Sequence, residues 1–118
     1  MKEVKRVKEV RRGQIFLADL NPVKGHEQGG YSPVLILQKD ILNRNLNTVV
    51  VAPITKNLKA KGLLTTWFIP GKQSGLKFDS VLLLYQIRTI DRRRLIKKVS
   101  QLDAAEMAAV REQLMFVV

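Results

Sequence analysis

The chain contains no cysteine and only one histidine. Without cysteine it can form neither a disulfide nor a thiolate metal site, and a single histidine excludes a zinc site built from several histidines. We therefore expect any chemistry of this protein to proceed without a structural or catalytic zinc. The sequence predicts neither a metal site nor a cofactor.

Long hydrophobic runs are missing as well. No segment reaches the ~18 uninterrupted apolar residues that a membrane span needs. The charged N-terminus has no hydrophobic stretch behind it, so it does not have the pattern of a secretory signal. We expect a cytoplasmic protein with no membrane partner. Aromatic residues make up only 6% of the chain, so aliphatic side chains must build its core.

Acidic residues are scarce relative to basic ones. The chain has 21 Lys and Arg against 10 Asp and Glu, which gives a net charge of +11 on 118 residues. Such a positive field favours a polyanionic partner. RNA and DNA are the leading candidates, followed by an anionic membrane surface or an acidic protein segment.

The first twelve residues differ from the rest of the chain. Val4, Val7 and Val10 recur at every third position, and the residues between them include six basic and two acidic side chains. This pattern fits either a frayed amphipathic helix or a disordered arm. Because three valines bury little apolar surface, we predict a basic, mobile arm over 1–12 and one domain over 13–118.

From Gly13 onward the pattern predicts short strands separated by Gly- and Pro-containing turns. The expected strands are 14–20, 33–38, 47–55, 65–69, 80–90 (one long strand or two joined at a bend) and 96–99. Pro53 lacks a backbone donor, so we expect an edge or a bulge at that point of its strand. Loops are predicted at 21–32, 56–63 and 71–79, and a turn or short helix at 39–46.

A single longer helix is expected at the C-terminus. Asp103 has the character of a helix N-cap, and the helix should run to about Met115. Its apolar face would consist of Leu102, Met107, Val110 and Leu114. Short strands followed by one terminal helix predict a mainly β fold, either a compact barrel or a sandwich.

Four stretches follow one another in a distinctive order. They are RGQIFLADLNP at 12–22, GHEQGGYSPVL at 25–35, VAPIT at 51–55, and DSV at 79–81 followed by QIRTID at 86–91 and RL at 94–95. Each stretch alone is modestly specific, whereas the ordered set is highly specific. Over roughly residues 11–115 the chain resembles the MazF/PemK family of toxin endoribonucleases from type II toxin–antitoxin systems.

The resemblance implies an SH3-like barrel of the MazF/PemK (CcdB-like) type with a C-terminal helix. It also implies a homodimer whose interface grooves bind single-stranded RNA, and a cognate antitoxin with an acidic disordered tail. Family members cut RNA at short sequences without a metal, using the RNA's own 2′-OH as nucleophile. Some relatives on this fold act on DNA gyrase instead, an outcome that the RNA-cutting motifs here do not favour.

One position departs from the family pattern. Attack by a 2′-OH needs a proton acceptor, a proton donor and positive charge on the phosphorane, and the planar fork of arginine suits the last role. The family places this arginine directly before the proline of its Gly-Gly-x-Arg-Pro motif, where this chain has Ser32. Three explanations are open. The chain is a naturally weakened or inactive member, or serine was introduced so that a toxic protein could be produced. In the third, another basic residue, such as Arg44 or Lys56, supplies the charge.

The remaining catalytic candidates come from the same resemblance. Thr55 matches the second catalytic position of the family, although a threonine at a strand end can also simply satisfy a backbone group. Glu27 either orients a basic group, acts as the base, or locks its own loop. His26 titrates near neutrality, but a lone loop histidine is more often a solvent-exposed bystander.

The candidate RNA-binding residues are Gln28, Arg44, Lys56, Tyr85 and Gln86. Tyr85 could stack on a base or fill an apolar gap, and Gln28 could equally hold its own loop. The Arg92–Arg94 run is expected to be a solvated turn that attracts RNA at long range. The sequence thus predicts a sequence-specific endoribonuclease toxin, with a binding-only relative as the alternative.

Overall fold

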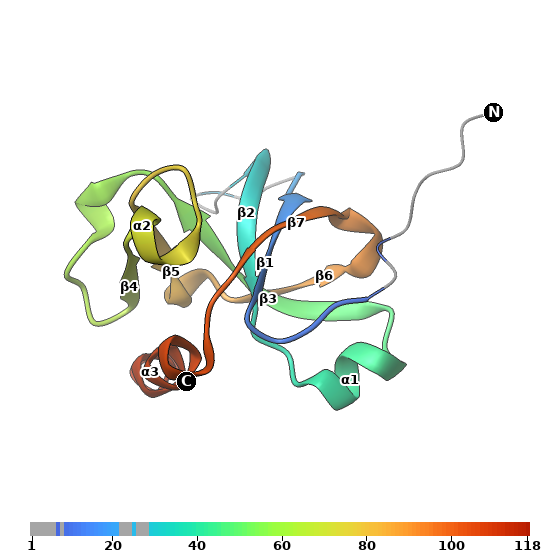
Figure 1. Cartoon of the computed structure of the whole chain (residues 1–118). Helices are drawn as coiled ribbons and strands as arrows, with labels where there is room; N and C mark the ends of the chain where they lie inside the picture. The colour runs from blue at the N-terminus through green and yellow to red at the C-terminus, as the bar shows by residue number, and fades with distance from the viewer. Residues whose placement is uncertain (1–6, 8, 22–24, 26–28) are drawn as a thin grey trace.

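The computed structural model describes residues 7, 9–21, 25 and 29–118. Figure 1 shows them as a curved β-sheet with short helices at its margins. The strands are β1 (Gln14–Asp19), β2 (Tyr31–Ile36), β3 (Thr48–Thr55), β4 (Thr66–Ile69), β5 (Ser80–Leu83), β6 (Arg88–Asp91) and β7 (Leu95–Gln101). The helices are α1 (Asp40–Asn45), α2 (Gly71–Ser74) and α3 (Ala104–Leu114), with 3-10 turns η1 (Leu58–Ala60), η2 (Leu84–Gln86) and η3 (Arg92–Arg94).

All seven strands belong to one sheet, in the order β4-β5-β3-β2-β1-β7, and β6 pairs with β3 beside β5. Neighbouring strands run antiparallel. The mainly β fold with a C-terminal helix is therefore confirmed. In the described part of the chain no ladder joins β6 to β7, because the η3 turn separates them. The expected barrel is thus a curled sheet that does not close.

Both faces of the sheet are buried, each in its own hydrophobic core. One core lies under α3 and joins Leu35, Ile54 and Leu82 of the strands to Met107 and Val110 of the helix. The other fills the concave side of the curl and consists of Val10, Phe16, Ala18, Leu20, Val34, Ile36, Val49, Val51, Ile90 and Leu95. Burial on both faces explains why β2 and β3 have nearly continuous apolar sequences.

Most predicted elements are present. The 80–90 segment is two strands joined at η2, and Asp103 caps α3 by accepting a hydrogen bond from Glu106 N at 2.8 Å. Two expectations were wrong in detail. The predicted 71–79 loop contains the short helix α2, and β7 extends beyond 96–99 because its whole length pairs with β1. In the described residues no helix is long and apolar enough to cross a membrane.

Pro53 lies in a central strand, so the predicted edge position was wrong. One side of β3 pairs with β6 through residues 48–51 and with β5 through residues 54–55. Pro53 falls between these two ladders, where its missing N–H costs no hydrogen bond on that side, while it still faces Val34 of β2. The proline therefore marks the position at which β3 changes its partner.

The end of the predicted N-terminal arm packs onto the domain. Val10 is 4% exposed and belongs to the concave core, against which the half-buried Val7 also packs. The backbone N–H of Arg12 donates to the Asp40 carboxylate at 2.7 Å, and this bond lowers the pKa of Asp40. Residues 1–6 and 8 lie outside the described residues, so the mobility of the arm stays a prediction.

Candidate functional site

Ser32 and Thr55, the two positions that match the catalytic positions of the family, lie near each other. The β2–β3 register pairs Ile36 with Val51 and Val34 with Pro53. The ladder ends there, but the hydrogen bond from Ser32 Oγ to the carbonyl of Ile54 at 3.1 Å keeps Ser32 next to the end of β3, and the same register extended by two residues would place it across from Thr55. Side chains directly opposite on neighbouring strands share a face, with Cβ atoms about 4.5–5.5 Å apart. The sheet thus brings the two positions together at one end of β3.

The hydroxyl of Ser32 is turned to the protein backbone. Ser32 is 3% exposed, and its Oγ donates to the carbonyl of Ile54 at 3.1 Å, with Pro33 O a second acceptor at 3.4 Å. A hydroxyl held in this way is not available to a phosphate. Serine also carries no charge, so position 32 contributes no electrostatic stabilisation of a phosphorane.

Thr55 is better placed to meet a ligand. Its side chain is half-buried, and its Oγ1 accepts a hydrogen bond from Asn57 N at 3.1 Å. This bond is the local backbone contact expected of a threonine at a strand end. Among the described residues the hydroxyl donates to no acceptor, so its hydrogen can reach an outside oxygen. Thr55 can therefore hold its own turn and also donate to a phosphate.

Lys56 supplies positive charge beside Thr55. It is exposed, and its ammonium nitrogen lies 4.9 Å from the centroid of the Phe78 ring. Phe78 itself is 53% exposed. No local pattern predicts this contact, because the two residues are far apart in the chain and Phe78 is a single aromatic in a loop.

Arg44, the other residue expected to replace the missing arginine, lies elsewhere. It belongs to α1, which precedes the start of β3, whereas Thr55 ends that strand. At about 3.3 Å of rise per strand residue, the seven steps from Thr48 to Thr55 span ~23 Å. Within one chain, only Lys56 of the two candidates accompanies Thr55.

Tyr85 and Gln86 lie in a turn beside β3, between the parts of β3 that pair with β5 and with β6. They occupy η2, which links β5 to β6, the two strands that pair with one side of β3. Tyr85 is 49% exposed, its hydroxyl accepts a hydrogen bond from Gln86 Nε2 at 3.3 Å, and its backbone N–H donates to Thr65 O at 3.2 Å. Both side chains are thus set on a fixed turn beside the site.

The three loop candidates His26, Glu27 and Gln28 lie outside the described residues. The base of their loop is well held, because Leu20 N donates to Gly30 O at 2.9 Å and Gly30 N donates to Asn21 Oδ1 at 3.0 Å. Gly30 has φ of +70°, a conformation that favours glycine. These bonds fix the two described ends of the segment, Asn21 and Gly30, close to Ser32 at the start of β2.

The Arg92–Arg94 cluster is engaged in the fold. Arg92 Nη1 donates to Asn43 O at 2.6 Å, and Arg94 Nη1 donates to the carbonyls of Asp19 and Asn21. Arg93 forms an ion pair with Asp91 at 2.9 Å, and its hydrogen bonds lower the pKa of the Asp91 carboxyl to about 2. The prediction of a merely solvated turn was therefore wrong for Arg92 and Arg94.

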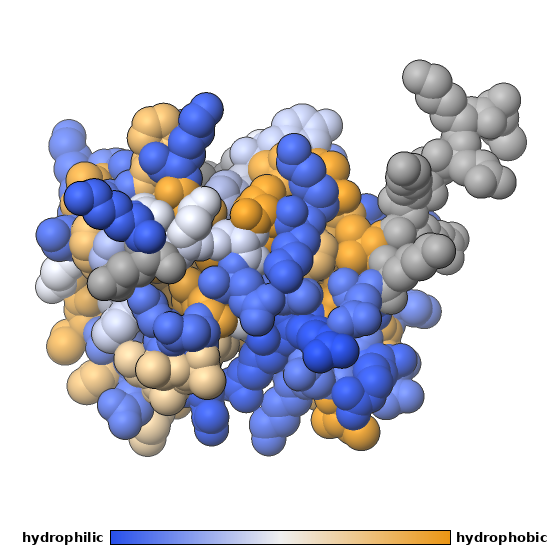
Figure 2. Space-filling model, viewed as in Figure 1, coloured by the Kyte–Doolittle hydropathy of each residue, from blue (hydrophilic) through white to orange (hydrophobic). Residues whose placement is uncertain are grey.

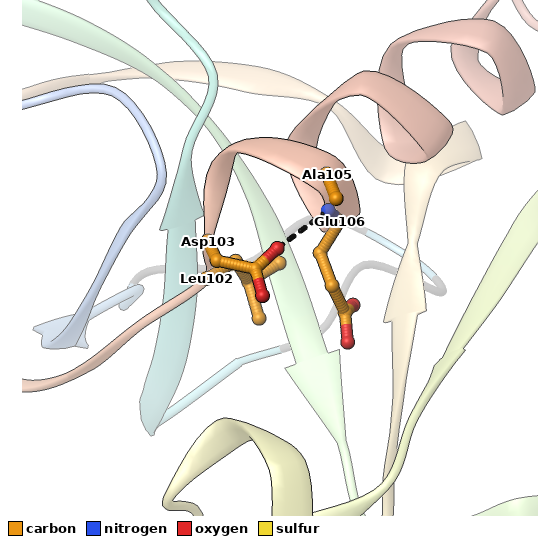
Figure 3. A pocket seen from close by; sticks show the side chains of 4 residues that line it. All are labelled: Leu102, Asp103, Ala105 and Glu106. Atoms are coloured by element: carbon orange, nitrogen blue, oxygen red, sulfur yellow. Dashed lines mark hydrogen bonds between the residues drawn. The ribbon is translucent and has the colours of Figure 1, made fainter.

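A hollow elsewhere on the described surface has a different lining. Figure 3 shows a hollow at the start of α3, lined by Leu102, Asp103, Ala105 and Glu106. Its two carboxylates do not suit a phosphate, and it contains none of the candidate residues. Figure 2 shows hydrophilic side chains over much of the face on which β7 lies, with apolar ones between them. The described residues contain no group of three or more potential metal ligands.

Comparisons with known proteins agree with this architecture. Residues 11–118 match the family described as PemK-like, MazF-like toxin of type II toxin-antitoxin system. The chain is 49% identical over 105 residues to Endoribonuclease EndoA of Bacillus subtilis, covering 89% of this chain and 90% of that protein.

Solved structures give the same result. MazF from Deinococcus radiodurans superimposes with a TM-score of 0.76 at 27% identity, over 92% of this chain and 94% of that one. A MazE-MazF structure from the same organism gives a TM-score of 0.69 at 27% identity, over 89% of this chain and 91% of that one. Together with the ordered motifs, these matches show that the chain belongs to the PemK-like, MazF-like toxins of type II toxin–antitoxin systems.

Proposed function

We propose that this toxin is an endoribonuclease that binds single-stranded RNA at the Thr55 end of β3 and cleaves it at specific sequences without a metal. The 2′-OH attacks the adjacent phosphorus and the bond to the 5′ oxygen breaks, leaving a cyclic phosphate and a free 5′-OH. The observation that carries the proposal is the half-buried Thr55, whose hydroxyl keeps its hydrogen for an outside acceptor, with the exposed Lys56 directly after it. The 49% identity to a protein named as an endoribonuclease supports it.

Each residue has a distinct role in the proposed reaction. The Thr55 hydroxyl donates to a non-bridging phosphate oxygen, and the Lys56 ammonium stabilises the charge that develops on the phosphorane. Glu27 is the proposed acceptor of the 2′-OH proton, and a water molecule donates the proton that turns the departing 5′ oxygen into the free 5′-OH. Because Ser32 is neutral and bound to Ile54 O, it stabilises no charge, and we expect slow cleavage compared with relatives that carry arginine there.

Cleavage of a long single-stranded RNA in EDTA tests the proposal. Cleavage should persist in EDTA, disappear in Thr55→Ala and fall by about two orders of magnitude in Lys56→Gln. Lys98→Gln removes the same charge from an exposed position on β7 and should cut like the unmodified protein. Abolition of cleavage by EDTA, or equal losses in the two lysine variants, would contradict the proposed mechanism.

A second candidate function is RNA binding without cleavage. The buried, backbone-bound hydroxyl of Ser32 favours it, because the chain then lacks the main electrostatic group of its family. The two functions differ in one result. A binding-only protein would retain RNA and release no products over long incubation, whereas Ser32→Arg would restore cleavage.

We also propose that the toxin acts in the cytoplasm as a homodimer and is neutralised by an antitoxin with an acidic tail. The net charge of +11 suits an acidic segment, and one of the similar solved structures is a MazE-MazF structure. The exposed apolar residues Met115, Phe116 and Val118 at the end of the chain give a dimer apolar surface to bury. Light scattering should give twice the monomer mass, and a monomer at micromolar concentration would refute the dimer.

A further inference from the structure

The contact between Lys56 and Phe78 lies immediately beside the proposed phosphate-binding threonine. Thr55 is opposite Val81 in the β3–β5 ladder, and Phe78 precedes Val81 by three residues. The Lys56 side chain extends from the residue after Thr55 to Phe78, with its ammonium nitrogen 4.9 Å from the centroid of the Phe78 ring. This distance is within the ~6 Å over which a cation is attracted to an aromatic ring. A hydroxyl, an ammonium group and an aromatic ring therefore succeed one another along the surface.

The backbone that carries Phe78 is held in place. Ser80 Oγ donates to Phe78 O at 3.0 Å, and Gly71 N donates to the carboxylate of Asp79 at 2.9 Å. A Cβ added to Gly71 would lie 3.0 Å from both Leu76 O and Phe78 C. Glycine at this position thus lets α2 pack directly against the loop. The ring is presented from a supported loop, although it stays 53% exposed.

A single exposed apolar side chain is common on protein surfaces and by itself carries no function. Phe78 differs because a cation from the neighbouring strand fixes its position and because its support is built from three separate contacts. Ordering an apolar ring in water yields no stability unless the ring is later covered. Nucleic-acid bases are flat and cover such rings regardless of their sequence.

We infer that Phe78 and Lys56 form a nucleobase subsite, in which the ring stacks on the base of a nucleotide flanking the phosphate held by Thr55. The inference rests on the proposed RNA-binding function and adds a specific place for one base. The Lys56 ammonium lies over one face of the ring, so the base stacks on the opposite face while the ammonium pairs with the phosphate of that nucleotide. Tyr85 and Gln86, further along β3, would then meet a different nucleotide of the same strand.

The test is a binding measurement by fluorescence anisotropy with two uncleavable probes. One is a short random-sequence 2′-O-methyl RNA, and the other is an abasic chain of equal length with the same phosphates. Stacking on an aromatic ring is worth about 5- to 100-fold in affinity. Phe78→Ala should weaken binding of the RNA by that factor and leave the abasic chain unchanged, whereas Phe78→Tyr should bind like the unmodified protein.

The two lysines next to the ring provide matched variants. Lys56→Gln should weaken both probes, because it removes charge that faces phosphate. Lys77→Gln removes the same charge from an exposed position beside Phe78 and away from the ring face, and should weaken each probe less. Thermal unfolding of each variant checks that the fold is intact.

The outcomes separate the subsite from the function on which it rests. The subsite is refuted if the unmodified protein binds the RNA and Phe78→Ala binds it equally well. It is also refuted if Phe78→Ala weakens binding of the abasic chain as much as binding of the RNA. In both cases the RNA site itself stands. If neither probe is bound, and Ser32→Arg also fails to bind or cut RNA, both proposals fall. Weakened binding of an acidic peptide with unchanged RNA binding would assign the ring to a protein partner and overturn the subsite.

Discussion

Replacing Ser32 with arginine should turn a slow nuclease into a fast one. A single preorganised donor aimed at developing charge is commonly worth 10²–10³ in rate, or about 2.7–4 kcal/mol. Ser32 contacts the carbonyl of Ile54, the residue before Thr55, so the long side chain of an arginine at position 32 is within reach of a phosphate held by Thr55. We therefore expect Ser32→Arg to raise the single-turnover cleavage rate at least 100-fold.

The same change should lower stability. It removes the hydrogen bond from Ser32 Oγ to Ile54 O, which contributes about 1 kcal/mol, and it places a larger side chain at a position that is 3% exposed, which typically costs about 1–3 kcal/mol more. In a domain of about 100 residues the lost hydrogen bond alone corresponds to a fall in Tm of about 4 °C. Ser32→Ala loses this hydrogen bond without adding bulk or charge, so it should show the smaller fall in Tm and leave the cleavage rate unchanged.

The assay is single-turnover cleavage of a long single-stranded RNA in EDTA, with Tm measured on the same samples. Ser32→Lys adds charge without the bidentate fork and should give an intermediate rate. A folded Ser32→Arg protein that cuts less than tenfold faster than the unmodified chain would refute the reasoning. Lys56 would then supply the essential charge already, and a Lys56→Gln, Ser32→Arg double variant would show whether either residue alone suffices.

Three further predictions concern the fold. Met107→Ala opens a cavity in the core under α3 and should lower the free energy of unfolding in urea by about 2–5 kcal/mol, whereas a change below 1 kcal/mol would contradict its burial. Asp103→Ala removes the N-cap of α3 and should cost about 1 kcal/mol in the same assay, with Asp103→Asn largely retaining stability. Asp91 has its pKa lowered from 3.8 to about 2 by Arg93, so its contribution is complete above pH 3.8 and is lost as the pH falls toward 2. Asp91→Asn should therefore flatten the fall in Tm across that pH range, and an unchanged slope would show that other carboxyl groups cause it.

Local signals in the sequence were enough for most of the elements. The β-branched run of β3 and the N-cap of α3 each depend on residues next to one another in the chain, and both are present as predicted. These predictions succeeded because period, propensity and capping act over a few residues. The resemblance assigned Ser32 and Thr55 to one site; the structure places Ser32 against Ile54, next to Thr55, and the catalytic roles of both stay a prediction.

Local sequence patterns could not predict contacts between distant parts of the chain. Arg94 binds the carbonyl of Asp19, 75 residues earlier, and no local pattern distinguishes it from the solvated Arg93 beside it. The pairing of Lys56 with Phe78 likewise depends on where β5 joins β3. From the sequence alone Arg44 could supply positive charge to the site. In the structure the length of β3 separates it from Thr55.

The partner change at Pro53 connects the fold to the site. Because proline cannot donate, the ladder on that side of β3 can pass from β6 to β5 without leaving a backbone donor unsatisfied. The final residues of β3 are thereby paired with β5, which brings the Phe78 loop beside Thr55 and Lys56. These three side chains lie beyond the two hydrophobic cores, whose residues end at Ile54 on this strand. Substitutions at Thr55, Lys56 and Phe78 should therefore change RNA binding and cleavage with little effect on folding, which separates the chemistry of this toxin from its stability.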